Sequence, residues 1–205
     1  MTKTSGSKSK KATKDSDNNE ILTETDTENE LNIEETYAIT KPELKLADKK
    51  LYDLDFMAQI TFLKDDLQIL YVNNNYLSSI DILNRIQSLK KINAGHNYIA
   101  SINLTLANLT ELDLRNNTLT RLPFFSKLPS LKILNVKSNK IEDVTSNFDT
   151  GKESKIEKLN LSFNLIQFKS KIDAKKFADN VNHFKNLRVL NLEHNKITDL
   201  HMLSI

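Results

Sequence analysis

The sequence lacks cysteine and tryptophan altogether, and its 205 residues include only three glycines and three prolines. Without cysteine there are no disulfides and no thiolate metal ligands, which argues against a small disulfide-stapled secreted module. Gly6, Gly95 and Gly151 are too far apart to form a phosphate-binding loop. No run of about 18 apolar residues is present, so the sequence predicts no membrane-spanning helix. The N-terminus also lacks the apolar stretch of a secretory signal, and we expect an intracellular soluble protein.

The charge is nearly balanced over the whole chain but not along it. The net charge is +2, which gives no general attraction to nucleic acid or membranes. Five lysines and no acid precede Asp15, whereas residues 15–35 contain nine acids and no base. Because few apolar residues occur there, we expect residues 1–40 to form a disordered charged tail. A docking arm is the alternative, since blocks of charge can bind other surfaces.

A repeated pattern fills the remainder of the chain, residues 41–205. Six segments carry apolar residues at relative positions 1, 4, 6 and 11 and asparagine at position 9. They begin at Leu67, Leu89, Leu109, Leu131, Ile156 and Leu187. A seventh, degenerate copy precedes them, with Leu44, Leu46, Leu51 and Leu54 in phase and Lys49 in the place of asparagine. One repeat cannot bury its own apolar face, so about seven repeats are expected to stack into one domain.

The shared pattern, as in LTELDLRNNTLTRL (109–122), resembles the leucine-rich repeat L-x-x-L-x-L-x-x-N-x-L. The resemblance implies an α/β solenoid with a curved parallel sheet on the concave side and 3₁₀ turns and short helices on the convex side. Three-residue steps from Ile80 through Leu83 to Ile86 agree with such turns. The repeat length is similar to a 22-residue intracellular subclass that includes protein phosphatase 1 regulatory subunits and axonemal dynein light chains. Bacterial internalins share the period but carry secretion and anchoring signals that this sequence does not show.

Two positions of the repeat have predicted structural roles. Short strands should place leucines such as Leu112 and Leu114 in the core and Asp113 on the opposite face. The position-9 asparagines follow the strands, where an amide can bond backbone groups of its own turn and of the next. We therefore expect a structural asparagine row of Asn75, Asn97, Asn117, Asn139, Asn164 and Asn195.

Two segments depart from the repeat. The polar insertion 145–155 is expected to be a surface loop. Residues 170–184 are expected to form an α-helix, because Ser170 and Asp173 make an approximate capping box. The apolar residues of this helix, which we expect to pack in the core, are Ile172, Phe177, Val181 and Phe184.

The outward side of the strands predicts a binding surface. Seven bases face four acids there, so the surface is mildly basic. It suits an acidic segment of another protein, whereas a nucleic-acid groove would need denser lysines and more aromatic residues than Tyr71 and Phe163. The predicted partner-binding residues are Tyr71, Lys91, His96, Asp113, Arg115, Lys137, Lys158, Phe163, Glu193 and His194.

The end of the chain offers a second candidate contact. Only five residues follow Leu200, and no polar cap is visible after the last repeat. Either Met202, Leu203 and Ile205 form a small cap or a neighbouring chain covers this end. A truncated sequence is the third explanation.

No arrangement in the sequence predicts catalysis, a metal site or a cofactor. His96 and His194 fall four repeats apart, about 20 Å at the spacing of strands, so they cannot share a ligand. We therefore predict a non-enzymatic scaffold that binds another protein in the cytoplasm, with the nucleus and the cytoskeleton or a cilium as alternative locations. The narrower alternatives are a regulatory subunit of protein phosphatase 1 and a structural component of a cilium, axoneme or other cytoskeletal assembly.

Overall fold

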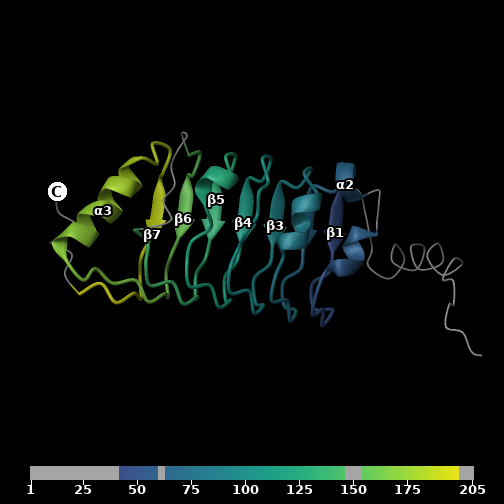
Figure 1. Ribbon diagram of the computed structural model, residues 1–205, viewed down its shortest axis with the longest axis horizontal. Coiled ribbons are helices and arrows are strands. Elements are labelled where there is room, and N and C mark those ends of the chain that lie inside the picture. Colours follow the sequence, from purple (N-terminus) through teal and green to yellow (C-terminus); the bar gives the residue numbers. More distant parts are fainter. Residues whose placement is uncertain (1–41, 60–62, 146–153, 199–205) are drawn as a thin grey trace, which may run out of the picture.

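The computed structural model describes residues 42–59, 63–145 and 154–198, which form a single open sheet with its connections. Seven parallel strands follow one another in chain order across this sheet, and Figure 1 shows them side by side along the long axis. The strands are β1 (Glu43–Lys45), β2 (Ile69–Tyr71), β3 (Lys91–Asn93), β4 (Glu111–Asp113), β5 (Ile133–Asn135), β6 (Lys158–Asn160) and β7 (Val189–Asn191). The predicted α/β leucine-rich repeat solenoid is confirmed.

The register of the sheet follows from the apolar pattern of the repeats. Each strand is three residues long, and its middle residue points into the core because side chains alternate along a strand. These middle residues are in register from strand to strand, as Leu44, Leu70, Ile92, Leu112, Leu134, Leu159 and Leu190. The flanking residues consequently form the concave face, where the predicted binding residues lie.

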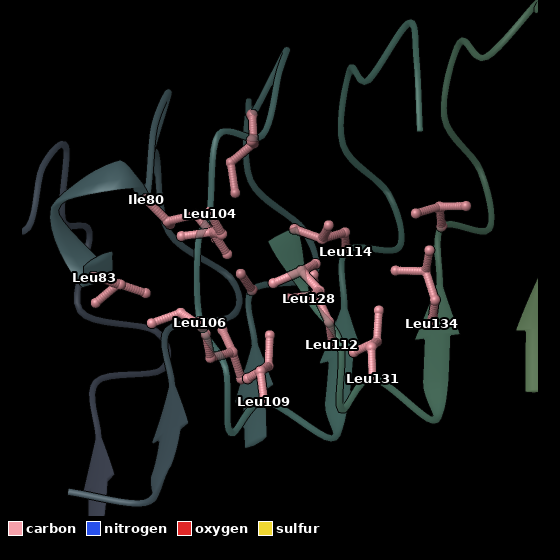
Figure 2. Packing of buried hydrophobic residues seen from close by; sticks show 14 of the residues in the cluster. Ile80, Leu83, Leu104, Leu106, Leu109, Leu112, Leu114, Leu128, Leu131 and Leu134 are labelled. Carbon is pink, nitrogen blue, oxygen red and sulfur yellow. The ribbon is translucent and has the colours of Figure 1, made fainter. Parts of the chain in front are cut away.

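The opposite side of the solenoid is built mainly from short turns. Three 3₁₀ helices occur in the described residues, η1 (Asp55–Ala58), η2 (Asp81–Arg85) and η3 (Phe125–Lys127), together with the one-turn helix α2 (Leu63–Asp66). The three-residue steps of the sequence predicted such turns, and Leu83 and Phe125 are buried as that spacing requires. Leu112, Leu114 and Leu128 belong to one core cluster, and Figure 2 shows them among its buried side chains.

The longest helix is α3 (Lys171–Asn182), in the segment where a helix was expected. Ser170 caps it, since its Oγ accepts a hydrogen bond from the Asp173 amide at 3.2 Å. Phe177 and Phe184 are buried, and the Phe184 ring meets Phe125 edge-on at 5.1 Å. The prediction was wrong for Ile172, which is 66% exposed. Ile172 lies in the first turn, where the helix has not yet reached the core cluster.

Three predictions fall on residues outside the described ranges. They are the tail at residues 1–40, most of the insertion loop, and the C-terminal cap formed by Met202, Leu203 and Ile205. The last described repeat is less well covered than the interior ones, because Leu190 and Leu192 are only partly buried whereas Leu112 and Leu114 are fully buried.

Candidate functional site: the concave face

The position-9 asparagines connect neighbouring repeats. Asn117 is buried, and its Oδ1 accepts a hydrogen bond from the Ile99 amide of the preceding repeat at 3.0 Å. Its Nδ2 donates to the Ala94 and Leu114 carbonyls, each at 3.0 Å. The same pattern recurs at Asn75, Asn97, Asn139, Asn164 and Asn195. These amides satisfy backbone groups of their own turn and of the preceding repeat.

A second polar row lies four positions earlier and was not recognised from the sequence. The side-chain Oδ1 of Asp113 accepts from the Arg115 amide two residues later, at 3.0 Å, which closes a small turn at the strand end. The equivalent turns are closed by Asn93, Asn135, Asn160 and Asn191. The recurrence of Asn or Asp at this position was the available signal. Tyr71 occupies the same position in β2. Because a tyrosine side chain cannot close this small turn, it has no such structural role there.

The residue before each structural asparagine has a left-handed backbone. These residues have φ between 52° and 56°, and they are Asn74, His96, Asn116, Ser138, Phe163 and His194. Asparagine tolerates this conformation, whereas a bulky side chain in it is an outlier. Phe163 is therefore the most strained member, and the residue is 44% exposed. Backbone strain of this kind clusters at functional sites, and Phe163 is not a member of the hydrophobic core cluster in the described residues.

Most charges on the strands β2–β4 are paired, and we call this part of the concave face the paired half. The Lys91 Nζ lies 2.9 Å from the Glu111 Oε1, because the register sets these residues side by side. A hydrogen bond and the charge of Glu111 raise the pKa of Lys91 above its ordinary value of 10.5. The Arg115 Nε lies 3.6 Å from the Asp113 Oδ2. Its side chain also packs over Gly95, where an added Cβ would lie 3.0 Å from the Arg115 Cγ.

The strands β5–β7 and the turns after them form what we call the basic half. Lys132 pairs with Glu157 at 3.3 Å. Three cations of this half have no ion pair within the described residues: Lys137, Lys158 and Arg188. Besides Glu157, the acid of the concave face in this half is Glu193. The register explains Lys158, because its neighbours across the sheet are Ile133 and Val189.

An exposed aromatic cluster lies at one edge of the basic half. The Phe163 ring stacks on the His194 ring with centroids 4.1 Å apart. The Lys137 Nζ lies over the Phe163 ring, 4.8 Å from its centroid. Three predicted binding residues from three successive repeats thus form one group, which offers a cation and an aromatic surface together.

The remaining predicted residues fall in two other places. Tyr71, Lys91 and Asp113 line a shallow hollow of about 300 Å³ over the paired half. His96 lies away from them in a hollow of about 350 Å³, with its Nε2 at 3.0 Å from the side-chain Nδ2 of Asn116. Tyr76 and Tyr98 also line this second hollow.

The tyrosines at this second hollow form a ladder that sequence reasoning missed. Tyr52 and Tyr76 have ring centroids 5.0 Å apart, and Tyr76 and Tyr98 are stacked at 6.2 Å. Tyr52 is 72% exposed, so the ladder is an aromatic surface rather than core. The signal was a tyrosine directly after the structural asparagine in two consecutive repeats.

The described residues contain no group of three or more metal-binding side chains. They also contain no helix long and apolar enough to cross a membrane. What the concave face presents is charge, aromatic rings and hydrogen-bonding groups on a parallel sheet.

Comparisons with known sequences give a partial match. Residues 107–149 match a family described as Leucine Rich repeats (2 copies), and residues 185–200 match one described as Leucine Rich repeat. None of the curated proteins compared with the chain matches it.

Solved structures share the fold at low identity. An internalin from Listeria monocytogenes str. 4b F2365 is 24% identical with a TM-score of 0.52, covering 76% of this chain and 48% of that chain. A leucine-rich repeat protein of Leptospira interrogans is 24% identical with a TM-score of 0.57, covering 75% of this chain and 44% of that chain. An internalin C2 of the same Listeria strain is 20% identical with a TM-score of 0.57, covering 80% and 76%. The chain spans less than half of the first two proteins.

Proposed function

We propose that this chain, which folds as a leucine-rich repeat solenoid, is a non-enzymatic scaffold that binds an acidic segment of another protein on the basic half of its concave face. The observation that carries the proposal is the group of Lys137, Phe163 and His194 on the same half as two further cations that have no ion pair within the described residues, Lys158 and Arg188. An acidic segment would supply the missing carboxylates, and an apolar residue within it would contact the Phe163 ring.

The strain at Phe163 supports the same location. A phenylalanine in the left-handed region costs about 1–2 kcal/mol relative to an ordinary backbone conformation. Asparagine, which stands at this position in two other repeats, would cost less. A ring that is strained, exposed and stacked on a histidine is explained by binding better than by folding.

The test is a titration of a fluorescent octaglutamate peptide, followed by anisotropy at low salt up to millimolar concentration. Lys137→Glu/Lys158→Glu should weaken binding at least about tenfold, a loss of about 1.4 kcal/mol. The matched control is Lys175→Glu/Lys176→Glu on α3, which changes the net charge equally at two exposed lysines. High salt should weaken the wild-type complex, because exposed charges are screened.

Two results would contradict the proposal. Equal binding by the wild type and the Lys137→Glu/Lys158→Glu variant would move the interaction elsewhere. Tighter binding of a single-stranded oligonucleotide than of octaglutamate would indicate a nucleic-acid surface instead.

The identity of the bound protein would distinguish two more specific functions. A phosphatase 1 regulatory subunit and a component of a cilium or other cytoskeletal assembly are supported by the repeat length alone. Affinity purification with the same variants separates them, since the first predicts co-purification with the phosphatase and the second predicts sedimentation with microtubules. In either case the partner should be lost with Lys137→Glu/Lys158→Glu and kept with the α3 control.

A further inference from the structure

The basic half and one segment of the same chain carry opposite charges. Residues 15–35 contain nine acids and no base. The basic half presents Lys137, Lys158 and Arg188 without an ion pair in the described part of the chain. A segment of this composition has the chemistry that the proposed function assigns to the partner.

We propose that the acidic segment 15–35 binds the basic half of its own solenoid and competes there with acidic partners. This inference rests on the proposed function, because it places a second occupant on the same surface. Binding of a partner would then require displacement of the segment, which makes the segment an internal inhibitor.

The length of the chain permits this contact. The described sheet begins with β1, and β6 lies five strands away, about 24 Å at the spacing of neighbouring strands. The seven residues 36–42, fully extended, span about 23 Å, and residues 15–35 span about 70 Å more. Many of the nine acids can therefore reach Lys158 and Arg188 without any change in the sheet.

The pattern of charge selects the basic half over the paired half. Lys91 and Arg115 already have carboxylates at 2.9 and 3.6 Å, so an incoming acid there would be repelled by Glu111 and Asp113. Over Lys158 no described acid is within ion-pair distance. Each contact between exposed charges is weak, but several act together, and tethering raises the local concentration of the segment to the millimolar range.

Carbodiimide cross-linking of the full chain tests the contact directly. This reagent joins a carboxylate to a lysine amine that touches it, and mass spectrometry identifies the pair. Cross-links from residues 15–35 should go to Lys137 and Lys158 several-fold more often than to Lys175 and Lys176, which are both exposed. They should fade near 1 M salt, where the screening length is about 3 Å. Mixing isotopically labelled and unlabelled chains excludes links between molecules.

Two cross-linking results would overturn the inference. One is an even distribution over all exposed lysines. The other is a set of links confined to the lysine block before Asp15, which would show that the two charged blocks pair with each other.

A variant with all nine acids of residues 15–35 changed to their amides tests the competition. This variant should bind octaglutamate about tenfold tighter than the wild type, because no tethered competitor remains. Equal affinity would overturn the inhibitory role while leaving the proposed function intact. If neither the wild type nor the amide variant binds octaglutamate, the proposed function is overturned. The cross-links would then test only whether residues 15–35 contact the basic half.

Discussion

The two halves of the concave face are made from the same repeat but differ in what their charges do. In the paired half, Lys91 and Arg115 neutralise Glu111 and Asp113, and the surface is occupied by its own ion pairs. In the basic half, Lys158 faces apolar neighbours across the sheet and Lys137 lies over an exposed ring. The choice of a few cross-strand neighbours thus changes the charge of one part of the sheet while the scaffold stays the same, and the proposed function places binding on that part.

The largest expected effect concerns the packing beneath the two halves. Leu114→Ala, in the interior, should lower the free energy of unfolding by about 2–5 kcal/mol through a cavity. Leu192→Ala, the equivalent change under β7, should cost clearly less, because Leu192 is only partly buried. Urea unfolding of both variants measures this difference. Equal losses would show that the last repeat is packed as tightly as the interior.

Substitutions in the asparagine row should also cost more stability in an interior repeat than in the last described repeat, with smaller losses overall. Asn117→Ala leaves buried backbone groups without partners and should cost about 1–3 kcal/mol. Asn195→Ala should cost less, because Asn195 is partly exposed and water can replace its bonds. Thermal unfolding of the two variants gives the comparison. A neutral Asn117→Ala would contradict a structural role for the row.

Phe163→Asn separates binding from folding in the basic half. It relieves the left-handed strain and removes two exposed ring contacts, so stability should rise by up to about 1 kcal/mol. Octaglutamate binding should nevertheless weaken, because Lys137 loses the ring that positions it. Unfolding and anisotropy measured on one preparation give both values. A destabilisation above about 1 kcal/mol would mean that the ring serves the fold.

The smallest expected effect, on a lysine pKa and on peptide binding, comes from removing one ion pair in the paired half. Glu111→Gln should return the pKa of Lys91 toward 10.5, which an NMR titration of the Lys91 side chain measures. Since the folded pKa of Lys91 is raised, the pair stabilises the fold below pH 10.5 and loses this contribution as the pH rises through the folded pKa. The freed Lys91 should also strengthen octaglutamate binding slightly. An unchanged pKa would show that Glu111 does not hold this ammonium.

The sequence predicts the scaffold well because its requirements recur in every repeat. The leucine pattern predicted the strands and turns, and the position-9 asparagines predicted a row of side chains whose hydrogen bonds to the preceding repeat the structure shows. The sequence could not predict the Lys91–Glu111 and Lys132–Glu157 ion pairs, because these depend on which residues meet across the sheet. Arg115, which the sequence predicts to bind a partner, lies 3.6 Å from Asp113 and packs over Gly95, and its binding role stays a prediction. The tyrosine ladder was missed since its residues occupy a position without a fixed role in the repeat.

The most direct test of the difference between the two halves is an NMR map of backbone amide shifts in the full chain during titration with octaglutamate. The account predicts that the largest shifts fall in the basic half, around Lys137, Lys158, Phe163 and Arg188. Shifts centred on Tyr71 and Lys91, or spread evenly over both halves, would contradict it.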